Sequence, residues 1–212
     1  MFFDAHSHTQ FAAFERDCEE VIDRAIALGV WMIIVGTQKD TSRRAIDVAQ
    51  RYPEGVYASV GLHPIHTEQL LHDAKELDFL AASTTEEQQE SQVFSVRKFR
   101  SRGEEFDYNY YRQLAQSPKV LTIGECGLDY YRLGGETKPR QRKAFERQIQ
   151  LSSDVKKPLM IHCRSAFGDL IDILAANSKS LVSPTAGIIH FFTGARVDAK
   201  VLLDLGFRFT FG

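Results

Sequence analysis

The chain begins MFFDAHSH (residues 1–8), in which a short apolar run, Phe2-Phe3, leads directly into two histidines, His6 and His8. Side chains alternate along a strand, so histidines at i and i+2 point to the same side, and both imidazoles can reach one metal ion. Other apolar runs along the chain are also followed by potential ligands: these are His63, Glu125, His162 and His190. A parallel barrel gathers the carboxyl ends of its strands around one mouth, whereas an open doubly wound sheet spreads them along a line. The repeated pattern therefore favours an α/β fold of the TIM (β/α) barrel type.

The rest of the chain alternates in the same way between apolar runs and amphipathic stretches. The runs lack period-two alternation, which is typical of strands buried on both faces. Predicted strands lie at 2–3, 30–35, 56–60, 120–123, 159–161, 188–189 and 207–211, and predicted helices at 17–28, 41–51, 68–82, 106–116, 140–155, 167–176 and 197–205. Such alternation indicates parallel strands joined by right-handed crossovers. Because seven strands leave a barrel one short, we predict a single barrel domain over residues 1–212, truncated before the eighth strand and so incomplete at its C-terminus.

Residues 83–105 interrupt this alternation. Residues 83–90, STTEEQQE, are polar and low in complexity, and four basic residues follow between positions 97 and 102. We interpret the segment as a surface insertion. A solvated loop is the favoured reading, and a flap that contacts phosphate is the alternative.

The composition excludes some classes of protein. The chain has 212 residues, of which 43% are hydrophobic and 25% charged, with a net charge of −2. A protein that coats nucleic acid would be strongly basic, so a nucleic-acid substrate would have to be held locally. Three cysteines without paired zinc spacing indicate reduced thiols in a cytoplasmic protein. The sequence shows no signal peptide and no apolar run long enough to span a membrane.

Glu125 directly follows an apolar run and is flanked by Gly124 and Gly127. A carboxylate can bridge two cations, whereas a neutral histidine cannot. His162 and His190 occupy the equivalent place after later runs, so we expect them to be ligands rather than hydrogen-bonded core histidines. Five nitrogen and oxygen ligands without thiolates suit Zn²⁺, Mn²⁺ or Mg²⁺. Because one carboxylate neutralises two divalent metal ions poorly, we also expect at least one further acid.

Several other residues are candidates for contacting a substrate. His63 could bind phosphate or support a metal ligand. Arg164 can form a fork with phosphate oxygens, and Tyr131 and Arg132 are placed to stack bases or pair with phosphate at the rim of the mouth. His66 is expected at the surface, and Cys126 and Cys163 are expected to pack away from the mouth.

Together these residues resemble the TatD family of metal-dependent deoxyribonucleases, within the amidohydrolase-like barrels. The matching motifs are DAHSH (4–8), SVGLHP (59–64), IGECGLDYYR (123–132), QRKAFERQIQLS (141–152), PLMIHCRSAFGD (158–169) and IIHFFTG (188–194). The resemblance implies a TIM barrel, two divalent metal ions and 3′–5′ exonuclease action on DNA. It also implies that His6 and His8 bind one metal, that Glu125 bridges, and that His162 and His190 bind the second.

The sequence departs from the family pattern at its end, where the family has a further aspartate after the eighth strand. The aspartates near the end of this chain lie on predicted helices and are not replacements. The leading hypothesis is a two-metal phosphodiesterase that acts on DNA ends or single strands, with Glu125 and His63 as catalytic residues, and that works as a monomer. An amidohydrolase acting on a cyclic amide, lactone or aminoacyl ester is the first alternative, although no lysine stands where such enzymes often carry a carbamylated one. An inactive, truncated metal-binding remnant is the second.

Overall fold

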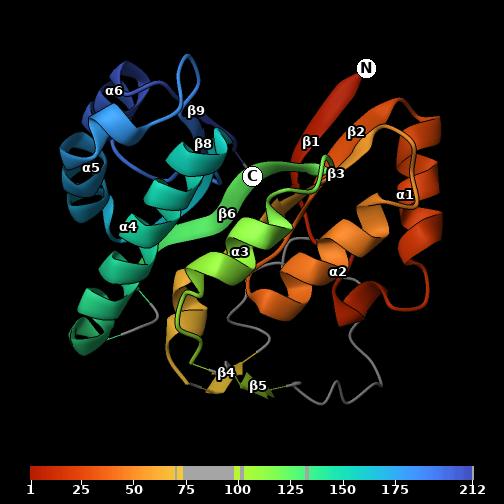
Figure 1. The fold of residues 1–212 in the computed structure, drawn as a ribbon, viewed down its shortest axis with the longest axis horizontal. Helices are drawn as coiled ribbons and strands as arrows, with labels where there is room; N and C mark the ends of the chain where they lie inside the picture. Colours follow the sequence, from red (N-terminus) through yellow and green to blue (C-terminus); the bar gives the residue numbers. More distant parts are fainter. Residues whose placement is uncertain (70, 74–97, 101–102, 132–133, 212) are drawn as a thin grey trace, which may run out of the picture.

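The computed structural model describes residues 1–69, 71–73, 98–100, 103–131 and 134–211. Its main feature is one curved parallel sheet of seven strands in the order β1-β2-β3-β6-β7-β8-β9 (Figure 1). The strands are β1 (Phe2–Ser7), β2 (Val30–Val35), β3 (Val56–Val60), β6 (Val120–Asp129), β7 (Leu159–Arg164), β8 (Gly187–Ile189) and β9 (Phe207–Phe209). Neighbouring strands follow one another along the chain, as in a barrel, so the predicted α/β barrel architecture is confirmed.

Helices connect these strands and lie outside the curved sheet. They are α1 (Cys18–Ala27), α2 (Lys39–Ala49), α3 (Tyr108–Leu114), α4 (Lys138–Val155), α5 (Phe167–Ala176) and α6 (Arg196–Asp204), with short 3-10 turns at η1 (Ala12–Phe14), η2 (Pro64–Thr67), η4 (Gly135–Thr137) and η5 (Ser178–Ser180). α1 and α6 are each followed by a glycine with positive φ, Gly29 at 74° and Gly206 at 90°. A left-handed residue at this place ends a helix, as the sequence predicted.

Both faces of the sheet are apolar. On the outer face, side chains such as Ile34 and Ile123 join the main core beneath the helices. On the inner face, Ile33, Val35 and Met160 form a separate buried cluster. This double burial explains why the strands read as continuous apolar runs instead of an alternating pattern.

One predicted helix is wrong in part. Residues 68–82 were expected to be helical, but β4 (Leu71–Asp73) is a strand that pairs antiparallel with β5 (Lys98–Arg100). Helical spacing is a local signal, and pairing with a segment more distant in the chain overrides it. Glu68 and Gln69 are not helical either, and the remaining residues of that helix lie outside the described residues, as does most of the 83–105 segment. The end of that segment is anchored, because Glu104 accepts a hydrogen bond of 2.7 Å from the Tyr111 hydroxyl.

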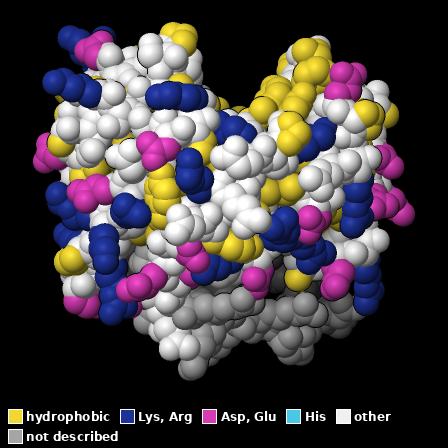
Figure 2. Space-filling model, in the orientation of Figure 1, with side chains coloured by type: hydrophobic (Ala, Val, Ile, Leu, Met, Phe, Trp, Pro, Cys, Tyr) yellow, Lys and Arg dark blue, Asp and Glu magenta, His cyan; other side chains and the backbone are white. Residues whose placement is uncertain are grey.

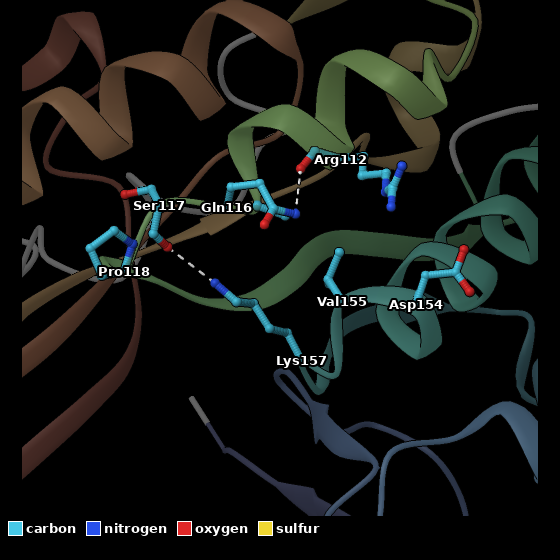
Figure 3. Close-up of a pocket in the computed structure, with 8 residues that line it drawn as sticks. Arg112, Gln116, Ser117, Pro118, Asp154, Val155 and Lys157 are labelled. Carbon is cyan, nitrogen blue, oxygen red and sulfur yellow. Dashed lines mark hydrogen bonds between the residues drawn. The ribbon is translucent and has the colours of Figure 1, made fainter.

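The two ends of the sheet differ in character. At the amino ends of the strands, a cavity of about 330 Å³ lies between α3 and α4. Lys157 on its wall donates to the carbonyl oxygen of Ser117 (Figure 3) and also to that of Val120. At the start of β1, Phe2 and Phe3 are 76% and 47% exposed, and Figure 2 shows hydrophobic surface and a hollow on that side of the molecule. Among the described residues, no helix is long and apolar enough to cross a membrane. The ligand-type side chains lie at the opposite, carboxyl ends of the strands, where barrel enzymes place their chemistry.

Candidate metal centre

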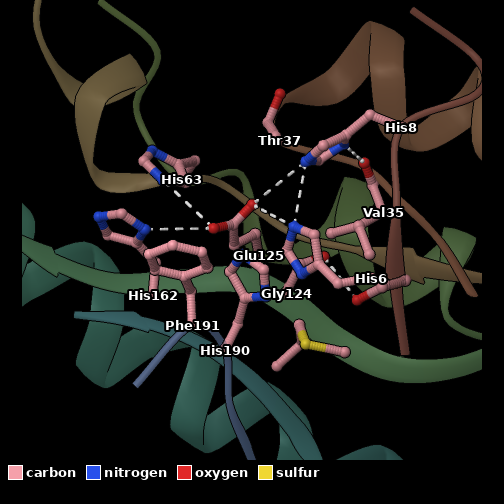
Figure 4. A network of polar contacts seen from close by, with 12 residues as sticks. His6, His8, Val35, Thr37, His63, Gly124, Glu125, His162, His190 and Phe191 are labelled. Carbon is pink, nitrogen blue, oxygen red and sulfur yellow. Dashed lines mark hydrogen bonds and ion pairs between the residues drawn. The ribbon is translucent and has the colours of Figure 1, made fainter. Parts of the chain in front are cut away.

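Glu125 lies at the centre of a cluster of histidines, and it is only 3% exposed (Figure 4). Its Oε2 lies 3.3 Å from His6 Nε2 and 3.9 Å from His8 Nε2. Its Oε1 lies 3.4 Å from His63 Nε2 and 3.3 Å from His162 Nδ1. These side chains come from β1, β6, β7 and the loop after β3, so the predicted convergence at one mouth is observed.

His6 lies on β1 and His8 directly follows that strand, with their Nε2 atoms 3.0 Å apart. His8 Nδ1 lies 2.9 Å from the carbonyl oxygen of Val35 on β2. A proton on Nδ1 satisfies that carbonyl and leaves the Nε2 lone pair facing Glu125. Such a contact commonly orients a metal-binding histidine.

His162 has a carboxylate on each side. Its Nδ1 faces Glu125, and its Nε2 lies 3.0 Å from Oδ2 of Asp129, which is 1% exposed. Asp129 is thus a second buried acid beside the cluster, which the sequence analysis did not single out. Its signal was present, because Glu125 and Asp129 are four residues apart on one strand and therefore share a face.

His63 differs from the other histidines in its hydrogen bonding. Its Nδ1 accepts a hydrogen bond of 3.2 Å from the backbone N–H of Ile65. The neutral ring therefore carries its proton on Nε2, the atom that faces Glu125. A ring in this form donates a hydrogen bond and has no lone pair for a metal at that atom. The geometry fits a donor to a carboxylate or phosphate oxygen better than a metal ligand.

His190 lies at the edge of the cluster. Its ring stacks on that of His6, with centroids 3.4 Å apart and planes at 11°, and its backbone N–H donates to the Ile161 carbonyl oxygen. Its closest ring contact is thus to the first histidine pair rather than to His162. Its expected role as a ligand of the second metal stays a prediction.

Burial and charge set the protonation of the cluster. Burial, with the neighbouring His6, lowers the pKa of both His8 and His190 to about 3. Burial also lowers the pKa of His63. Burial would raise the pKa of Glu125, but the surrounding histidines outweigh it and hold that pKa well below its ordinary value. The imidazoles of His8, His63 and His190 are therefore neutral near neutral pH, whereas the carboxyl group of Glu125 is ionised.

His162 is the exception. Burial would lower its pKa, but the hydrogen bonds to Asp129 and Glu125 outweigh this and raise the pKa to about 9. Without a metal, its ring is protonated near neutral pH and pairs with both carboxylates. A metal ion at Nδ1 would replace one of these protons.

Of the four predicted substrate contacts, the structure describes three: His63, Arg164 and Tyr131. The guanidinium of Arg164 lies 3.9 Å from the ring centroid of Tyr131, which is 66% exposed, at the same end of the sheet as the cluster. Arg132 lies outside the described residues. The expectation for His66 is wrong, because that residue is 6% exposed and packs in η2. Cys126 and Cys163 are buried, as expected of packing residues.

The donor set fits divalent metal ions. Two groups have ligand atoms within 4.8 Å of one another, His6 with His8 and Glu125, and His63 with Glu125 and His162. Among the described residues, His6 Nδ1 is a buried nitrogen without a hydrogen-bond partner. Nitrogen and oxygen donors around one buried carboxylate are ligands of Zn²⁺, Mn²⁺ or Mg²⁺. The proton on His63 Nε2 would leave Glu125 and His162 as the candidate ligands in the second group.

Comparison with known proteins also indicates a metal-dependent hydrolase. The family described as TatD related DNase matches residues 3–212. The chain is 31% identical to the uncharacterized metal-dependent hydrolase YabD of Bacillus subtilis, over 100% of this chain and 69% of that protein. It is also 31% identical to the 3′-5′ ssDNA/RNA exonuclease TatD of Edwardsiella piscicida, over 91% of this chain and 60% of the relative. The chain thus spans between three fifths and seven tenths of the length of these two relatives.

Solved structures agree with the fold. The TatD homologue YJJV of Escherichia coli superposes with a TM-score of 0.69 at 25% identity, over 98% of this chain and 66% of that one. A TatD family hydrolase of Entamoeba histolytica gives a TM-score of 0.67 at 20% identity, over 98% of this chain and 64% of that one. With the match across nearly all its length and the histidine–carboxylate cluster in place, the chain belongs to the TatD-related DNase family of metal-dependent hydrolases.

Proposed function

We propose that this chain carries the metal site of a 3′–5′ exonuclease acting on single-stranded DNA ends, with two divalent ions, Mg²⁺, Mn²⁺ or Zn²⁺, at the cluster. The observation that carries the proposal is the buried carboxylate of Glu125, which presents one oxygen to His6 and His8 and the other to His63 and His162. A carboxylate shared in this way suits a bridging ligand. His190 is proposed to complete the second site.

The residues around the cluster suit a phosphodiester substrate. Divalent ions held here would activate water and neutralise the negative charge that develops on the phosphate and leaving oxygens. His63 carries its proton on Nε2 and is neutral, so it can donate a hydrogen bond to a phosphate or leaving oxygen. Arg164 supplies a fixed positive charge, and Tyr131 offers an exposed face on which a base can stack.

The names of relatives support this substrate class. The Edwardsiella protein is named for single-stranded DNA and RNA, so RNA is a second substrate to test. An amidohydrolase would be favoured by a lysine on β6 at the position where Glu125 stands. Action as a monomer and a cytoplasmic location stay predictions.

The test uses single-stranded oligonucleotides labelled at the 5′ or the 3′ end, incubated with the chain and Mg²⁺, Mn²⁺ or Zn²⁺. We expect a 5′-labelled ladder that shortens from the 3′ end, complete inhibition by EDTA, and no product with E125Q. Metal binding without turnover of any oligonucleotide would favour the remnant hypothesis. Hydrolysis of a cyclic amide or lactone in place of DNA would favour the amidohydrolase.

A further inference from the structure

Helix α4 carries two glutamines, Gln141 and Gln148, whose side chains are fully buried at 0% exposure. They lie seven residues apart and thus on one face of the helix, toward the sheet. Glutamine is mostly exposed in proteins, and a buried amide is costly unless it is hydrogen-bonded. Both residues belong to the motif QRKAFERQIQLS (141–152).

Gln148 holds the residue that precedes His63. Its Oε1 accepts a hydrogen bond of 2.8 Å from the backbone N–H of Leu62, and its Nε2 donates one of 3.0 Å to the carbonyl oxygen of Leu62. The side-chain amide thus pairs with both backbone groups of one residue, as a neighbouring strand would.

Gln141 does the same for Asp129. Its Oε1 accepts a hydrogen bond of 2.8 Å from the Asp129 N–H, and its Nε2 donates one of 3.0 Å to the Asp129 carbonyl oxygen. The carboxylate of Asp129 in turn holds Nε2 of His162. Asp129 therefore links α4 to His162: its backbone is bonded to Gln141, and its carboxylate contacts the histidine ring.

The sheet itself leaves these two residues short of partners. The register between β3 and β6 ends at Val60 with Ile123, whereas β6 continues to Asp129. Beyond that point, Leu62 and Asp129 lie where the β3–β6 ladder has stopped. The two amides on α4 complete the backbone pairing there.

We propose that Gln141 and Gln148 are positioning residues with separate tasks: Gln141 fixes Asp129 and hence the ring of His162 for metal binding, and Gln148 fixes Leu62 and hence His63 for phosphate. The inference rests on the proposed metal site. It assigns two functions to one helix that touches neither metal nor substrate.

The test compares Q141E and Q148E with wild type and with Q150E. A glutamate at either buried position can still accept from the backbone N–H but cannot donate to the carbonyl oxygen, so one half of the pair is lost. Gln150 is the matched control, because it lies on the same helix, is exposed and bonds only to Asp154 among the contacts described for it. Q141L and Q148L remove both hydrogen bonds between the side-chain amide and the backbone. Near-ultraviolet circular dichroism at low temperature checks that each variant is folded.

The first readout is Mn²⁺ binding by calorimetry, and the second is binding of inorganic phosphate to the Mn²⁺-loaded protein. We expect Q141E to weaken one Mn²⁺ binding event about 10-fold. We expect Q148E to weaken phosphate binding while both Mn²⁺ events stay as in wild type and Q150E.

Two kinds of result would overturn the inference alone: wild-type Mn²⁺ and phosphate affinities in the folded glutamate variants, or equal losses of both affinities in Q141E and Q148E. If the glutamate variants fail to fold, Q141L and Q148L are read by the same criteria. Failure of the wild-type chain to bind Mn²⁺ would overturn the proposed function as well, so the two failures are distinguishable.

Discussion

Asp129 Oδ2 lies 3.0 Å from Nε2 of His162, on the far side of the imidazole from Glu125, whose Oε1 lies 3.3 Å from Nδ1. The ring is therefore fixed between two carboxylates, one of which belongs to the centre while the other orients the ring. A carboxylate that accepts from a ligating histidine sets its tautomer and makes the free nitrogen more basic.

The substitution Asp129→Asn tests this relationship. An asparagine can still accept the hydrogen bond but lacks the negative charge, so we expect divalent metal affinity to fall by about 10- to 100-fold. Calorimetric titration with Mn²⁺ measures it. Asp154→Asn is the control, because Asp154 is exposed and near the amino ends of the strands. Unchanged metal affinity in D129N would show that Asp129 does not orient the ligand.

The pKa of His162 gives a pH dependence with a defined sign. Folding raises this pKa from 6.5 to about 9, so the protonated ring stabilises the metal-free fold below pH 6.5, and that stabilisation is lost as the pH rises through about 9. A metal ion must displace the Nδ1 proton, so its binding becomes more favourable over the same range.

We therefore expect the rise in melting temperature on adding a divalent metal to grow from pH 6.5 toward pH 9. Thermal unfolding with and without Mn²⁺ across that range measures it, and H162Q should remove the trend. A metal-induced rise that is constant or shrinks with pH would contradict the assignment of His162 as a ligand that is protonated in the metal-free protein.

Gly61 packs closely against Gly124 of β6 and Gln148 of α4. A Cβ at this position would stand 2.6 Å from Gly124 Cα and 2.7 Å from Gln148 Oε1. We expect Gly61→Ala to lower the free energy of unfolding by about 1–3 kcal/mol, because neither the strand backbone nor the bonded amide can give way cheaply. Urea denaturation measures it. In Gly168→Ala, the matched control, the added Cβ meets nothing within 4 Å, so equal losses in the two variants would contradict this account.

The sequence predicts the parts of this molecule that depend on local pattern. The strands at Val30–Val35 and Val56–Val60 and the helix Phe167–Ala176 have the predicted bounds, because apolar runs and amphipathic spacing are properties of consecutive residues. The convergence of the histidines on Glu125 also follows, since all lie at strand carboxyl ends.

What the sequence did not predict depends on contacts between distant segments. β4 reads as the start of a helix, and only its pairing with β5 makes it a strand. The proton on His63 Nε2 depends on the turn that brings the Ile65 N–H to Nδ1. The hydrogen bonds of Gln141 could not be predicted either, because they depend on the packing of α4 against the end of β6.

Arg164 and Tyr131 are in contact at the rim of the site, and substitutions of Arg164 test whether its charge contributes to binding of the substrate. The guanidinium lies 3.9 Å from the ring centroid, and both residues are proposed substrate contacts. Arg164→Gln should weaken binding of a single-stranded phosphorothioate oligonucleotide and reduce the slope of log K against log salt by about 0.7, since one phosphate contact is lost. Arg164→Lys keeps the charge and should keep the slope, but it loses the planar fork, so binding still weakens.

Arg147→Gln is the matched control, because Arg147 also lies over a tyrosine, Tyr108, at 4.7 Å on the outside of α4. Fluorescence anisotropy at several salt concentrations measures all three variants. Equal salt slopes for R164Q, R147Q and wild type would mean that Arg164 contacts no phosphate, and the substrate would then have to be held by other residues of the mouth.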